Sequence, residues 1–204
     1  MRTTGKLIVL AAMVFAALSL VMAEDKPAKP AKPEDQQAMM KQYMEMMAPG
    51  PQHQAMAKDV GKWSGAMKMW EKMGAPPQEA TTSKEVRMDM DGRYMVEDET
   101  SMMMGMPYHG HNTVGYDKFR GEYTFSYYDN MSTGIFTGSG KGDADGKTIT
   151  FNCKMDDPMS NRKDVPSRIV IKTVDDDHNS FEMYTTSPDG KEYKCMETAY
   201  TRVK

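Results

Sequence analysis

The stretch Asp143-Ala-Asp-Gly-Lys-Thr-Ile-Thr-Phe-Asn-Cys-Lys-Met155 decides the fold class of this 204-residue chain. It begins with Asp and Gly residues, which tolerate the positive φ angles of hairpin turns. After the turn, apolar side chains at positions 149, 151, 153 and 155 alternate with polar ones. Alternation with a period of two places the apolar side chains on one face of a strand. The stretch therefore predicts a hairpin with one face in a core.

The same pattern of short runs separated by turn residues about every 8 to 15 positions continues from Gly61 to the end of the chain. The candidate strands are residues 62–71, 80–90, 93–103, 109–117, 122–129, 133–141, 147–155, 167–174, 180–187 and 191–202. Ten consecutive antiparallel strands are too many for a flat open sheet, and closure removes the exposed edges. We therefore predict an all-β fold for residues 61–204, a ten-stranded antiparallel up-and-down barrel.

Residues 1–23 have the pattern of a secretory signal peptide. Arg2 and Lys6 precede an uncharged apolar run over residues 7–21, and small residues end it. The run is shorter than the roughly 20 apolar residues of a membrane-spanning helix. We expect cleavage after Ala23 and a secreted or periplasmic protein without a membrane span.

Two further segments precede the barrel. Residues 24–37 alternate Pro with Lys and Ala, which predicts a disordered Lys/Pro-rich tether. Residues 38–60 predict short helices, the first over 38–48 with Met40, Met44 and Met47 at helical spacing and the second over 52–60.

Composition and charge exclude several classes of function. The chain has 26 basic and 29 acidic residues and a formal net charge of -3, which argues against nucleic acid and anionic membranes as partners. Four His must supply any catalytic base, and no Gly-x-Ser-x-Gly or Cys-His motif is present. We expect neither enzymatic activity nor a cofactor.

With the strands assigned, the sequence resembles two groups of proteins. Gly61-Lys62-Trp63 on the first strand and Arg202 on the last resemble the Gly-x-Trp motif and terminal Arg of the calycins, the superfamily of lipocalins and fatty-acid-binding proteins. More specifically, the chain is similar over about residues 49–203 to the bacterial family named domain of unknown function 1579, which is grouped with the calycins. The matching blocks are residues 49–53, 61–63, 91–94, 107–110 with 115–117, 129–134, 189–194, and 196–197 with 200–202. This resemblance implies a calycin/lipocalin-like barrel in an exported protein and no established activity.

A small barrel of this kind holds one small ligand in its lumen. The leading hypothesis is a small apolar or amphiphilic molecule in a cavity lined by Met and Tyr, because Met-rich surfaces repack around varied ligands. The candidate lumen residues are Trp63, Tyr116, Tyr123, Phe125, Tyr127, Met183, Met196 and Arg202, of which Trp63 and Arg202 would close the base.

A Met/His cluster at residues 101–111 suggests a second function, periplasmic binding of Cu(I) or Ag(I), since thioethers and imidazoles select copper. The candidate ligands are Met104, Met106, His109 and His111. Against this, all four Leu lie within residues 1–23, so Met must supply the aliphatic core in the rest of the chain. A third hypothesis is a structural or partner-binding module that docks through the helix of Met40, Met44 and Met47.

Cys153 and Cys195 are the two cysteines. An oxidising compartment favours a disulfide. The predicted topology opposes it, because the seventh and tenth strands are not neighbours in a meander and distant Cα atoms cannot be bridged. Both alternatives stay open at this point.

Overall fold

The structure, a computed structural model, describes residues 32–204. The predicted signal peptide and most of the predicted tether lie outside the described residues. The chain divides into two compact units at Tyr43, and residues 44–204 form the unit that contains all the strands.

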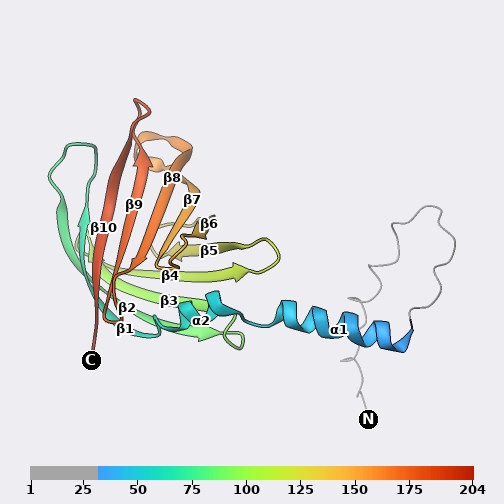
Figure 1. Ribbon diagram of the computed structural model, residues 1–204. Coiled ribbons are helices and arrows are strands. Elements are labelled where there is room, and N and C mark those ends of the chain that lie inside the picture. Colours follow the sequence, from blue (N-terminus) through green and yellow to red (C-terminus); the bar gives the residue numbers. More distant parts are fainter. Residues whose placement is uncertain (1–31) are drawn as a thin grey trace, which may run out of the picture. The chain divides into compact units, whose positions relative to one another are not determined.

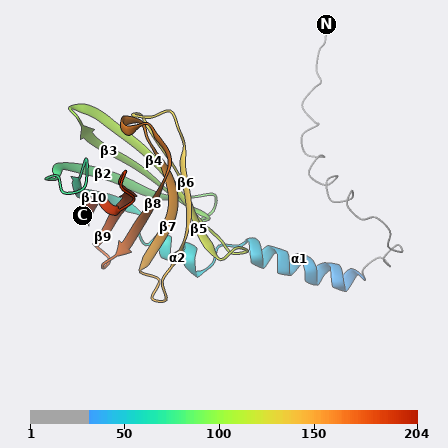
Figure 2. The same ribbon diagram turned by 90° about the horizontal axis from the view of Figure 1, so that it is seen from above.

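Ten antiparallel strands form a closed barrel in which each strand pairs with its neighbours in the sequence and β1 pairs with β10 (Figure 1, Figure 2). The strands are β1 (Gly61–Met69), β2 (Gln78–Asp89), β3 (Tyr94–Met103), β4 (Met106–Asp117), β5 (Glu122–Asp129), β6 (Phe136–Gly142), β7 (Thr148–Asp157), β8 (Arg162–Thr173), β9 (His178–Thr186) and β10 (Glu192–Arg202). The predicted fold class is confirmed.

The largest difference from the predicted strands is at β8, which begins at Arg162 rather than at residue 167. Pro166 lies inside this strand, and Pro lacks the N–H that a central strand requires. Pairing of β8 with β9 begins only at Ser167, so Pro166 is paired with β7 alone and occupies an edge position. The predicted strand, which began after Pro166, was therefore too short at its start.

Helix α1 (Pro33–Met47) begins five residues before the predicted start and includes residues that the sequence assigned to the tether. Pro33 occupies the first helical position, which Pro favours. Glu34 and Asp35 follow in the first turn, where negative charge complements the helix dipole. Charge and the N-terminal Pro therefore extend the helix beyond its apolar residues.

Helix α2 (Pro51–Ala57) packs near β3 and β4. The backbone N–H of Gly50 donates to Nδ1 of buried His53 at 3.0 Å, which caps the helix. Burial and the charges of Lys118 and Arg93 lower the pKa of His53, so the imidazole stays neutral and keeps this acceptor. His53 is thus a structural residue.

The base of the barrel is closed by Trp63 and Arg202, as the calycin resemblance implies. Trp63 is 1% exposed, and its Nε1–H donates to the Asp59 carbonyl at 2.8 Å. The Arg202 guanidinium lies 4.2 Å from the centroid of the Trp63 ring. It also donates to the carbonyls of Val60 and Lys58, each at 2.7 Å. The Arg202 side chain therefore connects β10 to the residues that immediately precede β1.

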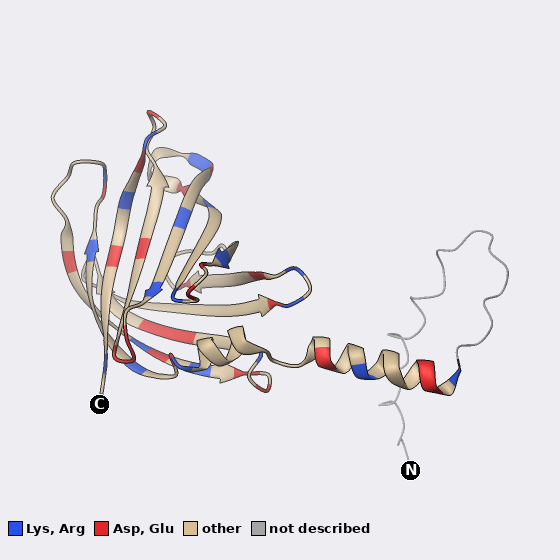
Figure 3. Cartoon of the chain, viewed as in Figure 1, with Lys and Arg blue, Asp and Glu red and all other residues tan. Residues whose placement is uncertain are grey.

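Basic and acidic residues are interspersed along the strands of the barrel (Figure 3). Within residues 32–204, no helix has the length and apolar character needed to span a membrane.

Cys153 and Cys195 are both free thiols. They lie on β7 and β10, which are separated by β8 and β9 in the sheet. Each thiol donates to a backbone carbonyl at 3.4 Å, Cys153 to Ser167 and Cys195 to Met183. Burial raises the pKa of both thiols to about 11, which suppresses the reactive thiolate at neutral pH.

We expect Arg202→Ala to lower the free energy of unfolding by about 2–4 kcal/mol, because it removes several charge-assisted hydrogen bonds and a cation–π contact. Urea unfolding followed by Trp fluorescence measures the change. The matched control is Arg120→Ala, whose exposed guanidinium makes only surface ion pairs and should cost less than about 1 kcal/mol. Equal effects of the two substitutions would contradict the structural role of Arg202.

We expect the native protein to react slowly with a disulfide reagent at pH 8, because both thiols are held far from their thiolate form. Unfolding without reductant should then release two reactive thiols per chain. Fewer than two would show that the cysteines pair in solution.

Candidate functional site

The barrel encloses a cavity of about 1080 Å³. Ligand-binding cavities commonly measure about 300–1,000 Å³, so this one has room for a small organic molecule. Its lining reaches the loop of residues 130–135 between β5 and β6 and the turn after β7. Trp63 does not line it, so the cavity lies above the closed base.

One wall of the cavity is apolar and comes from β5 to β10. Phe125 contacts Phe136 and Phe151 edge to face, each with ring centroids 5.1 Å apart. Further apolar lining side chains are Met155, Ile169, Ile171, Phe181, Met183 and Met196. This wall suits the hydrocarbon part of a ligand.

The opposite wall, from β2, β3, β4 and β10, carries a buried ion pair. Lys84 donates to Glu97 Oε1 at 2.8 Å, and the two side chains are 11% and 13% exposed. The Lys84 ammonium also lies 4.2 Å from the centroid of the Tyr200 ring. Asn112 donates through Nδ2 to Glu97 Oε2 at 2.7 Å. Glu97 is thus bound through both oxygens.

The charge state of Glu97 depends on Lys84. Burial by itself would raise the pKa of this carboxyl group, but attraction to Lys84 and hydrogen bonds from Lys84 and Asn112 outweigh burial. The pKa therefore lies below its usual value and Glu97 is ionised at neutral pH.

A second carboxylate, Glu99, stands beside this pair without a cation of its own. Its Oε1 accepts from the Thr82 hydroxyl at 2.6 Å and from the Tyr200 hydroxyl at 2.9 Å. Burial and the charges of Glu99 and Glu97 raise the pKa of Tyr200 well above its usual value, so its phenol remains a donor. Within residues 32–204, no ion pair involves Glu99 and no hydrogen bond reaches its Oε2.

Two buried side-chain oxygens on the polar wall lack hydrogen-bond partners among the described residues, Asn112 Oδ1 and Thr198 Oγ1. Because the Asn112 amide must turn its NH₂ group to the Glu97 carboxylate, its Oδ1 is fixed as an unpaired acceptor. Thr198 is 2% exposed; its hydroxyl is close enough to Tyr200 to lower the pKa of that phenol but lacks hydrogen-bond geometry. Both residues line the cavity. Buried polar atoms are normally paired, so an unpaired one needs an explanation.

Gly110 creates space for two phenols on the same wall. A Cβ atom at this position would lie 2.6 Å from the Tyr127 hydroxyl and 3.0 Å from the Tyr108 hydroxyl. Burial and the charges of Glu99 and Asp129 raise the pKa of Tyr108, which keeps this hydroxyl protonated. Both phenols line the cavity as additional hydrogen-bonding groups.

The candidate lumen residues from the sequence fall into two groups. Phe125, Tyr127, Met183 and Met196 line the cavity. Trp63 and Arg202 form the base, and Tyr116 and Tyr123 pack against one another with ring centroids 4.8 Å apart, outside the cavity lining.

Sequence reasoning missed Lys84, Glu97, Glu99 and Asn112. Acidic and basic residues are mostly exposed, so composition alone gives no reason to place these side chains in a lumen. A signal was present in the alternation of β3, where Glu97 and Glu99 have the same parity as buried Met95. That parity indicates two inward carboxylates.

The structure places the candidate copper ligands in the turn between β3 and β4 and on β4. Met104 is 87% exposed in a turn, and Met106 is half-exposed at the start of β4. His109 and His111 lie on the outer face of β4, and His111 Nδ1 is engaged with Asp98 Oδ1 at 2.6 Å. No group of three or more His, Cys, Asp or Glu placed to hold a metal occurs within residues 32–204. Copper binding here stays a prediction.

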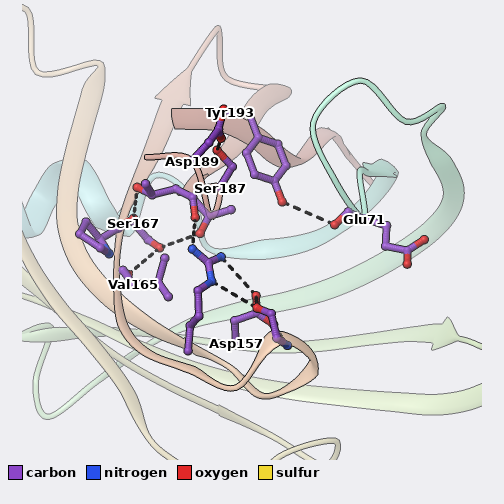
Figure 4. A network of polar contacts seen from close by, with 12 residues as sticks. Glu71, Asp157, Val165, Ser167, Ser187, Asp189 and Tyr193 are labelled. Atoms are coloured by element: carbon purple, nitrogen blue, oxygen red, sulfur yellow. Dashed lines mark hydrogen bonds and ion pairs between the residues drawn. The ribbon is translucent and has the colours of Figure 1, made fainter. Parts of the chain in front are cut away.

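Polar contacts fix the rim of the barrel near the turn after β7 (Figure 4). Arg162 donates to the Thr186 carbonyl at 2.8 Å and to Asp157 Oδ2 at 3.2 Å. On the same rim, the Tyr193 hydroxyl donates to the Glu71 carbonyl at 3.5 Å (Figure 4). These contacts join neighbouring loops beside the cavity mouth.

Comparison with known proteins identifies relatives by sequence and by fold. The profile of the family described as Protein of unknown function (DUF1579) matches residues 48–202. The chain is similar to the crystal structure of Rv2717c from M. tuberculosis, with a TM-score of 0.59 and 12% identity over 77% of this chain and 100% of that chain. A redesigned β-barrel aligns with a TM-score of 0.39 and 11% identity over 74% of this chain and 96% of that chain. No curated protein matches the chain. At 12% identity, the likeness to the mycobacterial structure shows the fold alone.

We expect Lys84→Met to destabilise the protein by about 3–5 kcal/mol at pH 7.5, because it leaves Glu97 buried and charged without a partner. Without Lys84, burial raises the pKa of Glu97 above its unfolded value of about 4.3. In this variant, Glu97 then stabilises the folded state only at pH values below that unfolded pKa, and the stabilisation is lost as the pH rises. In the wild type the pKa of Glu97 is lowered instead, so its contribution to stability is lost as the pH falls.

The difference in the free energy of unfolding between Lys84→Met and the wild type should therefore be smaller at pH 4.5 than at pH 7.5, as measured by urea unfolding. The matched control is Lys68→Met, which removes an exposed pair with Glu197 and should cost less than about 1 kcal/mol at both pH values. A gap for Lys84→Met that does not change with pH would contradict this account of Glu97.

Proposed function

The chain belongs to the family Protein of unknown function (DUF1579), and we propose that its barrel binds one small amphiphilic molecule in the lumen. The observation that carries this proposal is the two-sided cavity of about 1080 Å³. A purely structural barrel would fill its interior with apolar side chains, since buried polar groups cost free energy unless they are paired.

The arrangement of the two walls supports an amphiphilic ligand over a wholly apolar one. The aromatic and Met side chains from β5 to β10 would contact the hydrocarbon part. The polar wall holds unpaired Asn112 Oδ1 and Thr198 Oγ1, which an apolar ligand would leave unpaired. A ligand with a polar group at one end would satisfy both walls.

The Met content of the apolar wall supports a cavity that adapts its shape. Met155, Met183 and Met196 are unbranched and flexible, so they adjust to ligands of different shape at low cost. The rigid aromatic stack of Phe125, Phe136 and Phe151 would hold the wall while the Met side chains move.

The proposal includes export of the protein. It rests on the signal-peptide pattern of residues 1–23, which are outside the described residues. The ligand would then be a molecule present outside the cytoplasm.

We expect the wild-type protein to bind the neutral apolar dye Nile red in the lumen, with a blue shift and an increase of its fluorescence. Ile171→Trp should weaken the dye affinity at least about tenfold, a loss of about 1.4 kcal/mol, because the indole occupies the lumen. The matched control is Val170→Trp, the same substitution on the outer face of β8, which should leave the affinity unchanged within about twofold.

Circular dichroism verifies that both variants fold. Equal affinity of the wild type and folded Ile171→Trp would exclude the lumen as the binding site. Native mass spectrometry of gently purified protein should also show a bound small molecule that the Ile171→Trp variant lacks.

A further inference from the structure

The charged groups that line the lumen are unbalanced. Two lysines, Lys84 and Lys154, face five carboxylates, those of Glu97, Glu99, Asp129, Asp156 and Asp164. Lys84 is paired with Glu97, and Lys154 with Asp164 at 3.7 Å near the mouth. The lumen therefore has three carboxylates in excess, and no basic side chain lining it is left over to receive an anionic ligand.

Glu99 is distinguished among these carboxylates by its place beside the unpaired acceptor. It follows Glu97 by two residues on β3, so the two side chains share the inner face. In the register of β3 with β4, Glu97 is opposite Asn112 and Glu99 is opposite Gly110. Glu99 is thus diagonal to Asn112 on one wall, within reach of one bound molecule. Neither Glu99 Oε2 nor Asn112 Oδ1 has a donor among the described residues.

These two acceptors select the polar group of the ligand. A carboxylate or phosphate head offers no proton to Asn112 Oδ1 and would be repelled by Glu99 in a cavity where water screens charge poorly. An ammonium group provides several N–H donors and a positive charge in one atom. It would satisfy the amide oxygen and pair with Glu99, which has no cationic partner among residues 32–204.

We propose that the lumen recognises amphiphiles with a protonated amine head, which donates to Glu99 and Asn112 while the hydrocarbon chain lies against the aromatic wall. This inference rests on the proposed function, because it names the class of molecule that the lumen takes. Lys84 does not oppose the amine, since its charge is compensated by Glu97. The Tyr108 and Tyr127 hydroxyls are further acceptors for the N–H groups.

Calorimetric titration with four decyl amphiphiles below their micelle concentrations tests the head group while the chain stays constant. The probes are decylamine, decyltrimethylammonium, 1-decanol and decanoate. At pH 7.5 we expect decylamine to bind at least about tenfold more tightly than decanoate, which is negative, and than decyltrimethylammonium, which has the charge without N–H donors. 1-Decanol, with one donor and no charge, should lie between.

The variant Glu99→Gln retains an oxygen for the Thr82 and Tyr200 hydroxyls but removes the charge. It should weaken decylamine about tenfold or more and leave 1-decanol within about twofold. The matched control is Glu85→Gln, the same change at an exposed position of β2, which should alter neither affinity.

The outcomes separate this inference from the proposed function. Equal binding of all four amphiphiles, or tightest binding of decanoate, would overturn the amine preference and leave the lumen as a ligand site. Equal binding of decylamine and decyltrimethylammonium would overturn the role of the N–H donors. Failure of every probe to bind the wild type, or full binding of all to Ile171→Trp, would overturn the proposed function and this inference with it.

Discussion

Closure of the barrel between β1 and β10 is the constraint on which the rest of the structure depends. The two strands pair from Trp63 opposite Arg202 to Met69 opposite Met196. Arg202 adds hydrogen bonds to two carbonyls before β1 and covers the Trp63 ring. A closed barrel has no free edge, and every second side chain is directed inward. The cavity and its two walls exist only because this junction holds.

A core without Leu explains how the interior can be both closed and adaptable. The only Leu residues of the chain precede residue 24, so Met fills positions that Leu usually takes. Met and Leu differ little in volume, and exchange of one for the other usually costs less than about 1.5 kcal/mol. Met keeps more conformational freedom, which favours a lumen that adjusts to its contents. Packing accounts for buried Met56, Met67, Met95 and Met183, whereas Met104, Met106 and most other Met side chains of residues 32–204 are exposed.

The fold was predictable from the sequence because alternation and turn residues are local signals. The ten strands and their order follow from patterns such as that of residues 143–155. The closure of the barrel base by Trp63 and Arg202 follows from the resemblance to the calycins. The polar wall was not predictable by the same means, because a charged residue is assigned to the outer face by its average behaviour. Glu97 and Glu99 are exceptions that contact Lys84, Asn112 and Tyr200, partners from three other strands. The parity of β3 indicates that both carboxylates are directed inward, but no local pattern shows which residues pair with them.

The buried charges of the lumen cost stability, and this cost supports a role in recognition. A buried ion pair is often no better for stability than apolar residues of similar size, because desolvation offsets the attraction. Lys84 and Glu97 therefore contribute little that a pair of apolar side chains would not. What they provide is a fixed orientation of the Asn112 amide and a neutral neighbour for Glu99. The ion pair thus prepares an acceptor site whose own carboxylate is unpaired, and the free energy of binding an amine would recover part of the desolvation cost.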